Sequence, residues 1–285
     1  MNEMIPPKEE RAEALKGLGT SRKRVEDARF TQGKGNYVDD LKLPGMLFGD
    51  FVRSPHAHAR VKSINADKAK ELPGVIAVLT AADLSPLNLH WMPTLAGDVQ
   101  MVLADGKVLF QGQEVAFVVA EDRYIAADAC ELVEVEYEEL PVVVDPFKSL
   151  EKDAPVLRED LEGKTEGAHG PRKHHNHIFT WEQGDKEATE SVVGSADVVA
   201  EEMVYYHRTH PCPLETCGCV ASMDKVNGKL TVHGTFQAPH AVRTVASLIS
   251  GIAEHNIRII SPDIGGGFGN KVGVYPGYIC SIVAS

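Results

Sequence analysis

A short glycine-rich stretch, residues 263–271 (DIGGGFGNK, here called the glycine loop), has the composition of backbone that approaches a ligand closely. Four glycines, Gly265, Gly266, Gly267 and Gly269, fall within five consecutive positions. Because glycine lacks a Cβ atom, such backbone adopts φ > 0 conformations and can aim several N–H groups at phosphates or sulfurs. A simple structural turn has the same composition, and both interpretations stay open on these residues alone.

The glycine loop matches neither of two common nucleotide-binding motifs. The fingerprint G-x-G-x-x-G ends in glycine, whereas Asn270 occupies that position here. A Walker A loop ends in G-K-[ST], whereas Lys271 is followed by Val272. A nucleotide site is therefore only weakly indicated, although a loop that leaves the carboxyl end of a strand suits an anion.

A second candidate for chemistry is Gln237, which lies in TFQAPH (235–240) where a strand gives way to a helix. Pro239 suits the first turn of that helix. A neutral amide offers N–H donors at any pH, and the helix dipole adds positive potential nearby. Such a donor can stabilise an oxygen that gains negative charge during a reaction. The alternative is a glutamine that caps its own helix.

The histidines and cysteines form no recognisable metal motif. The run HHNH (174–177) looks like a metal cluster, but it lacks a second ligand group at a defined spacing. The spacing of Cys212, Cys217 and Cys219 is not that of a zinc site, and on a strand the last two would share one face and pack in the core. None of the five cysteines has an iron–sulfur spacing, so such a centre would belong to another chain.

The elements that must position these residues fall into two units. Residues 36–140 predict a compact α/β unit, in which strands and helices alternate. Its strands are predicted at 47–53, 59–64, 75–80, 114–120 and 133–137, and its helices at 66–72 and 123–133. A polar arm (1–35) precedes this unit, and a proline-punctuated linker (141–176) separates it from the second unit (177–285).

The second unit carries both candidates for chemistry. A strand is expected at 196–207, and a hairpin over 219–237 turns at Asn227–Gly228. An amphipathic helix at 240–252 precedes a strand at 256–261, which runs directly into the glycine loop. The chain then ends in an apolar element without a stop signal, so we expect the polypeptide to have been cut short.

Composition is that of a soluble globular protein and excludes several functions. The 285 residues, 43% hydrophobic and 25% charged, suggest about two domains. The net charge is −12 without a basic stripe, so nucleic acid is not expected as a partner. The sequence contains no membrane-length apolar run and no secretory signal, so we expect a reducing, cytoplasmic location.

Taken together, four segments resemble the large subunits of molybdenum hydroxylases, the xanthine dehydrogenase and aldehyde oxidase family. In the family's order they are RFTQGKGNYVDDLKLPGMLFGDFVRSPHAHARVKSI (29–64), PLETCGCVASM (213–223), GTFQAPH (234–240) and SPDIGGGFGNK (261–271). Within the family, the chain is most similar to the subunits that oxidise carbon monoxide, through KHHNHIFTWEQGDKE (173–187) and Asn270–Lys271. The resemblance extends from about Gly17 to Ser285.

This resemblance implies a mixed α/β fold, with a hammerhead-type α/β domain at 36–140 and the start of a molybdopterin-binding region at 177–285. It implies that Gln237 hydrogen-bonds an oxo ligand of molybdenum. The residues implied to approach the cofactor, through backbone amides and one aromatic ring, are Gly266, Gly267, Phe268 and Gly269.

The resemblance also implies a reaction, CO + H2O to CO2 with release of two electrons and two protons, and a set of cofactors and partners. Molybdenum would be carried by molybdopterin cytosine dinucleotide, and copper would be held by a cysteine beyond residue 285. A glutamate near the family's C-terminus would act close to molybdenum. A small subunit would carry iron–sulfur clusters and a medium subunit FAD. Two such heterotrimers would form a heterohexamer in the cytoplasm, with some of it loosely held at the inner face of the membrane.

Three alternatives remain open at this point. A related hydroxylase would act on an aldehyde or an N-heterocycle and would differ in the loop that carries the copper ligand. The chain could instead be a non-catalytic fragment or scaffold, because groups needed for turnover are absent from it. A flavin- or NAD-binding domain would bind a nucleotide without molybdenum.

Overall fold

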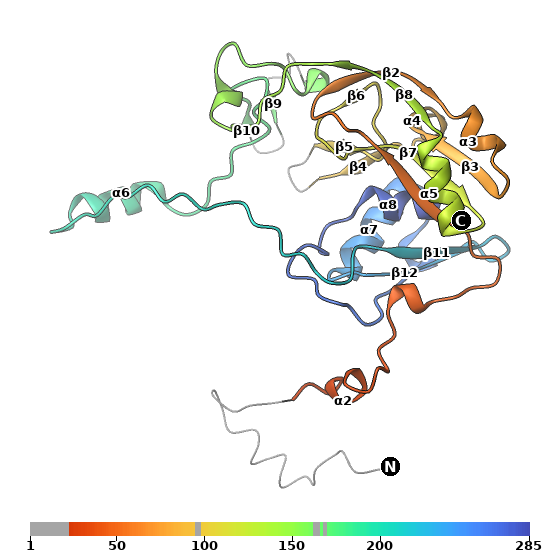
Figure 1. Cartoon of the computed structure of the whole chain (residues 1–285). Helices are drawn as coiled ribbons and strands as arrows, with labels where there is room; N and C mark the ends of the chain where they lie inside the picture. Colours follow the sequence, from red (N-terminus) through yellow and green to blue (C-terminus); the bar gives the residue numbers. More distant parts are fainter. Residues whose placement is uncertain (1–22, 95–97, 162–165, 168–169) are drawn as a thin grey trace, which may run out of the picture.

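The computed structural model describes residues 23–94, 98–161, 166–167 and 170–285. Its N-terminal unit contains two antiparallel three-stranded sheets with helices against one of them (Figure 1). In order across each sheet, the strands are β1 (Phe48–Arg53), β7 (Glu114–Ala120) and β3 (Val75–Thr80), then β6 (Lys107–Val108), β2 (Ala59–Asn65) and β8 (Glu134–Glu139). Helices α3 (Asp67–Glu71) and α5 (Arg123–Glu131) pack on the first sheet. The strands and helices predicted for this unit are thus confirmed, within two residues at their ends.

The central strand β7 is apolar after its first residue, Glu114, because both of its faces are covered. Ala116 and Val118 pack in the cluster that includes residues of α3 and α5, whereas Phe117 and Val119 pack toward the second unit. Successive side chains of a strand point to opposite faces, so a strand buried on both sides reads as a continuous apolar run.

The second unit is a three-stranded sheet that combines a hairpin with a parallel crossover. The strands are β11 (Cys219–Asp224), β12 (Lys229–Gly234) and β13 (Ile257–Ile260), and helix α7 (Pro239–Ser250) connects the last two. The hairpin turns at Asn227–Gly228 as predicted, with Gly228 at φ 65°. The Asp224 carboxylate accepts hydrogen bonds from the N–H groups of Val226 and Asn227, which stabilises the turn.

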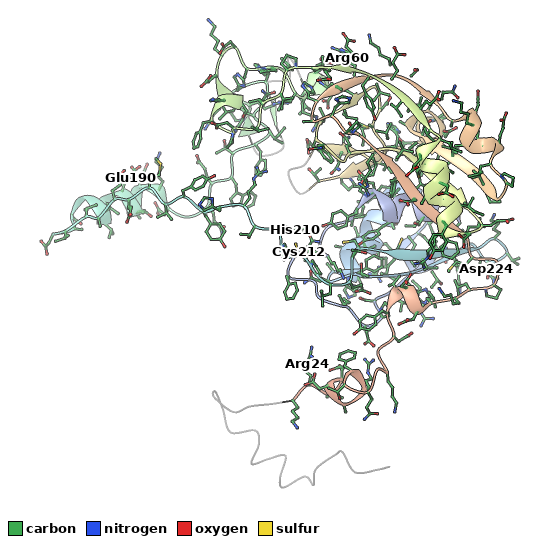
Figure 2. The ribbon with its side chains drawn as sticks, in the orientation of Figure 1. Arg24, Arg60, Glu190, His210, Cys212 and Asp224 are labelled. Atoms are coloured by element: carbon green, nitrogen blue, oxygen red, sulfur yellow. The ribbon has the colours of Figure 1, made fainter. Side chains whose placement is uncertain are left out.

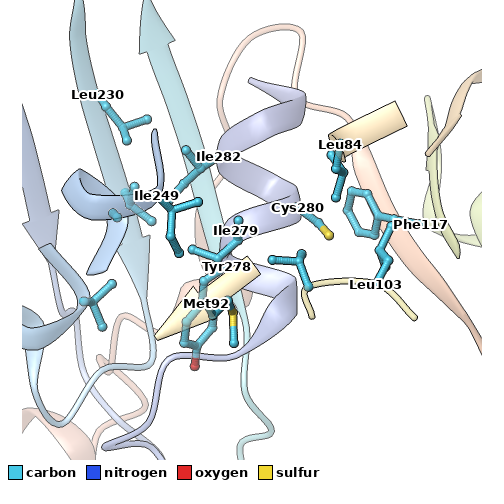
Figure 3. Packing of buried hydrophobic residues seen from close by; sticks show 14 of the residues in the cluster. Leu84, Met92, Leu103, Phe117, Leu230, Ile249, Tyr278, Ile279, Cys280 and Ile282 are labelled. Atoms are coloured by element: carbon cyan, nitrogen blue, oxygen red, sulfur yellow. The ribbon is translucent and has the colours of Figure 1, made fainter. Parts of the chain in front are cut away.

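One continuous hydrophobic core joins the two units (Figure 3). Leu84, Leu103 and Phe117 come from the first unit, and Leu230 and Ile249 come from the second. Between them lies α8 (Pro276–Ala284), which carries the buried residues Tyr278, Ile279, Cys280 and Ile282. The sheet that precedes Gln237 and the glycine loop therefore packs against this shared core.

Some elements were not predicted, and one predicted strand is absent. No regular element forms at 196–207, where Met203, Tyr205 and Tyr206 are exposed, because no strand in the described parts of the chain pairs with it. The helix before it, α6 (Lys186–Gly194), projects away from the two units (Figure 1). The other elements not predicted are the helices α2 (Asp27–Phe30) and α4 (Ala81–Leu84), the strands β4 (Trp91–Pro93), β5 (Val99–Met101), β6 (Lys107–Val108), β9 (Glu166–Gly167) and β10 (Gly170–Pro171), and the 3-10 turns η1 (Val38–Asp40), η2 (Ser85–Leu87), η3 (Lys148–Leu150), η4 (Glu159–Leu161) and η5 (Glu254–Asn256).

The described part of the N-terminal arm, from Lys23, is fixed to the start of the glycine loop. This part contains α2 (Asp27–Phe30), and the 3-10 turn η1 (Val38–Asp40) follows the arm. Both Asp263 oxygens accept from the guanidinium of Arg29, and this hydrogen bonding lowers the Asp263 pKa to about 2. Asp263 also accepts from the Asn36 N–H at 2.8 Å, and its own N–H donates to the Asn36 carbonyl at 3.1 Å. Among the described residues, no helix is both long and apolar enough to cross a bilayer.

We expect Arg29→Met to release this arm from the loop. Hydrogen exchange of the amides at 27–40 should then rise by roughly tenfold, because a bidentate hydrogen bond between charged groups is lost. Arg24→Met is the matched control, since it removes an exposed pair with Asp27 on the same arm. Equal exchange in Arg29→Met and the parent protein would show that Arg29 does not hold the arm.

Candidate functional site

Gln237 and the glycine loop are brought together by two neighbouring parallel strands. In the pairing of β12 with β13, Leu230 lies opposite Ile257 and His233 lies opposite Ile260. The carboxyl ends of parallel neighbours meet at one edge of the sheet, and this edge is the usual place for ligand binding in open α/β sheets. Both candidates follow those strand ends within a few residues.

The side chain of Gln237 binds the backbone of the glycine loop. Its Oε1 accepts hydrogen bonds from the N–H groups of Gly269 at 3.0 Å and Lys271 at 3.1 Å. The backbone N–H of Gln237 donates to the Lys271 carbonyl at 3.0 Å. Two N–H donors identify the bound atom as the amide oxygen, which leaves Nε2 as a donor on an exposed residue. The side chain makes no capping hydrogen bond to α7, so the helix-cap interpretation is wrong.

Two glycines of the loop pack closely against side chains of other segments. A Cβ atom on Gly267 would lie 2.4 Å from Cδ and 2.6 Å from Oε1 of Gln237. A Cβ atom on Gly265 would lie 2.5 Å from Cβ of Glu215. Both distances are far below the 3.5–4.0 Å optimum for carbon atoms, so a side chain at either position would push these partners away.

Three consecutive N–H groups of the loop are available to a ligand. Within the residues that the structure describes, the N–H groups of Gly266, Gly267 and Phe268 make no hydrogen bond. Gly266, Phe268 and Gly269 have φ angles of 95°, 50° and 87°. Successive N–H groups in turns of this kind form a concave nest that binds anions. The Phe268 side chain is 73% exposed beside them. We call Gln237 Nε2 and these three N–H groups the donor cradle.

A buried ion pair links the glycine loop to a third segment of the chain. Lys271, whose side chain is fully buried, donates through Nζ to Glu215 Oε2 at 2.9 Å. Gly265 N–H donates to the same oxygen at 2.8 Å. No local pattern in the sequence indicates this pair, because the two charges lie 56 positions apart and only the fold brings them together.

The residues weighed as metal ligands are not gathered at this site. His175 precedes α6, and its Nε2 is 3.1 Å from the Ala154 carbonyl. His210 and Cys212 lie on the extended segment between α6 and β11 (Figure 2). In the part of the chain that the structure covers, no three His, Cys, Asp or Glu side chains are arranged to hold a metal.

The cysteines differ in burial, and one expectation about them is wrong. Cys217 is exposed because it precedes β11 and does not share a strand face with Cys219, so it does not pack in the core. Cys219 packs against the core, and burial raises its pKa to about 11. Burial also raises the pKa of Cys130 to about 12 and raises that of Cys280. These three thiols stay protonated near neutral pH, which makes them poor nucleophiles.

Two protein-family models match consecutive parts of the chain. Residues 32–141 match the model described as "Aldehyde oxidase and xanthine dehydrogenase, a/b hammerhead domain". Residues 169–285 match the model described as "Molybdopterin cofactor-binding domain". The expected fold class, a hammerhead-type α/β domain followed by a molybdopterin-binding region, is therefore confirmed, whereas the limits 1–35, 36–140, 141–176 and 177–285 stay predictions.

Individual relatives agree with these matches. The chain is 73% identical to the carbon monoxide dehydrogenase large chain of Afipia carboxidovorans, over 98% of this chain and 35% of the relative. It is 66% identical to the corresponding chain of Hydrogenophaga pseudoflava, over 100% of this chain and 36% of the relative. The solved structure of reconstituted CO dehydrogenase from Oligotropha carboxidovorans superposes with a TM-score of 0.89, at 73% identity over 98% of this chain and 35% of that one.

The chain thus spans about a third of the length of the curated relatives it matches. The two family models follow one another along it in the order of its two structural units, and together they leave few described residues unmatched. The chain belongs to the xanthine dehydrogenase and aldehyde oxidase family of molybdenum hydroxylases.

Proposed function

We propose that this chain is part of the molybdenum-containing subunit of a carbon monoxide dehydrogenase, which oxidises CO with water to CO2 and releases two electrons and two protons. The observation that carries the proposal is the donor cradle, found in a chain 73% identical to a large chain of that name. The cradle supports the cofactor, and the high identity supports carbon monoxide over an aldehyde or an N-heterocycle.

The residues present fit a molybdenum cofactor. The donor cradle offers N–H groups, which bind oxygen, sulfur or phosphate acceptors and do not bind a bare cation. Since a Cβ atom at Gly267 would strike Gln237, the bare backbone keeps the side-chain donor and the backbone donors together. When bound, the cofactor supplies the two-electron redox chemistry, while the protein binds and orients it.

Gln237 would hold an oxygen through Nε2 while its Oε1 stays bound to the loop. A donor fixed in this way stabilises charge that develops on that oxygen without reorganising during the reaction. An amide has no charge to lose over the ordinary pH range, so this hydrogen bond persists at any working pH. Phe268 would cover the cofactor with its exposed ring and exclude water locally.

Other groups of the proposed enzyme would lie outside the described site. The pterin would be molybdopterin cytosine dinucleotide, and copper would be held by a cysteine beyond residue 285. Partner subunits would carry iron–sulfur clusters and FAD, and two heterotrimers would pair. We place this assembly in the cytoplasm, with some of it at the inner face of the membrane. The net charge of −12 supports the absence of nucleic acid from this set of partners.

Substrate preference tests the proposal directly. The holoenzyme that contains this chain should oxidise CO with an artificial electron acceptor, and should leave aldehydes and N-heterocycles unchanged. Oxidation of an aldehyde or a heterocycle without CO oxidation would replace the proposal by the related hydroxylase. A purified holoenzyme without molybdenum would overturn the proposed cofactor as well.

We expect two substitutions at Gln237 to separate its two hydrogen-bonding roles. Gln237→Glu keeps an oxygen for Gly269 and Lys271 but removes the Nε2 donor, whereas Gln237→Ala removes both roles. Each should lower kcat by about 10²–10³, or about 2.7–4 kcal/mol, the usual loss for one donor to a developing oxyanion. Molybdenum content and melting temperature should change least in Gln237→Glu. A turnover rate equal to that of the parent enzyme in both variants would remove Gln237 from the mechanism.

Gly267→Val should block binding of the cofactor. Its side chain would displace Gln237 and crowd the free N–H groups, so molybdenum content per protein should fall well below the parent value. Gly273→Ala is the matched control in the same region, because its Cβ would find its nearest neighbour at 3.8 Å. Full molybdenum occupancy in Gly267→Val would show that the loop is only a turn.

A further inference from the structure

We propose that Glu215 and Lys271 are positioning residues for the site, and that their ion pair fixes the glycine loop so that Gln237 presents its donor. This inference rests on the proposed function, because it concerns the same donor cradle. Neither side chain belongs to the cradle itself. Glu215 accepts a hydrogen bond from Gly265 N–H in the glycine loop, and the Lys271 side chain pairs with Glu215.

Glu215 holds the loop at both of its ends. Its N–H donates to the Gly265 carbonyl at 3.2 Å, and its Oε2 accepts from the Gly265 N–H at 2.8 Å. The same oxygen accepts from Lys271 Nζ at 2.9 Å, on the far side of the free N–H groups. One carboxylate oxygen therefore binds both the backbone of Gly265 and the side chain of Lys271, which flank the free N–H groups.

Lys271 transmits this constraint to Gln237. Its backbone N–H donates to Gln237 Oε1 at 3.1 Å, and its carbonyl accepts from the Gln237 N–H at 3.0 Å. Its side chain is fully buried, and the ion pair with Glu215 anchors it. A shift of the lysine side chain would therefore move the backbone atoms that orient the glutamine.

The Glu215–Lys271 pair is buried, unlike an ordinary surface ion pair. A surface lysine keeps its ammonium group in water, whereas this one is enclosed and its charge is matched by a carboxylate that is only 19% exposed. The other oxygen of Glu215, Oε1, is buried without a hydrogen-bond partner in the described residues. Glu215 is thus held through one oxygen, and loss of Lys271 would leave its charge unmatched.

The test compares Lys271→Met with the double variant Glu215→Gln/Lys271→Met, both in the holoenzyme. The double variant leaves no charge of this pair buried, and its new amide still offers an oxygen to the Gly265 N–H. The double variant therefore keeps the test valid if Lys271→Met alone fails to fold. Lys62→Met is the control for a lysine substitution, because Lys62 pairs with Glu138 on a half-exposed surface away from the loop. Hydrogen exchange over 263–275, molybdenum content and kcat are measured for each.

We expect both variants to speed exchange of the Gly269 and Lys271 amides and to lower kcat roughly tenfold to a hundredfold, as small misplacements of positioned groups do. The loss should not add to that of Gln237→Ala, because the pair acts through Gln237. Lys62→Met should match the parent enzyme in all three measurements. Unchanged exchange in a folded double variant, or fully additive losses of kcat, would overturn this inference. Failure of the proposed function would appear separately, as a parent enzyme that does not oxidise CO or a Gln237→Ala variant with full turnover.

Discussion

The parallel pairing of β12 with β13 is the constraint on which the donor cradle depends. It brings the residue after one strand and the loop after the other to the same edge, although they are separated by a helix and a turn. A slip of one residue in this pairing would turn every side chain of the strand to the opposite face. The register is fixed because Leu230, Val232 and Ile257 are buried in the shared core.

Two other parts of the structure hold that edge of the sheet in place, the shared hydrophobic core and the contacts to Asp263. Helix α8 and the apolar face of β7 fill the space under the sheet, so the hammerhead domain and the molybdopterin-binding region share one core. Asp263 is also bound by Arg29 of the arm and by Asn36 directly after it, which fixes the start of the loop. A loop rich in glycine loses much conformational entropy on ordering, and these contacts offset that cost.

Local patterns in the sequence predicted the elements that depend on neighbouring residues. The hairpin at Asn227–Gly228, helix α7 and strand β13 each follow from turn chemistry or from periodic apolar residues. The role of Gln237 as a donor to a molybdenum ligand came from the family resemblance. The structure explains why Nε2 would be the donor, because Oε1 already accepts hydrogen bonds from the glycine loop. The roles of the site residues themselves stay predictions.

Contacts between distant segments could not be predicted in the same way. Glu215 and Lys271, or Arg29 and Asp263, carry no local signal, because charged residues are common and their partners lie far along the chain. The prediction of a strand at 196–207 was wrong for a related reason. Its composition suits a strand, but β structure needs a neighbouring strand to bind its backbone groups, and none of the described strands takes that place.

The burial of three thiols has a consequence for oxidative damage to the protein. Oxidants attack the thiolate form of cysteine, and Cys130, Cys219 and Cys280 all have pKa values raised by burial. The interior therefore resists sulfenic acid formation and mixed disulfides. Such damage would begin at Cys212 and Cys217, which are both exposed and lie on either side of Glu215 in the sequence.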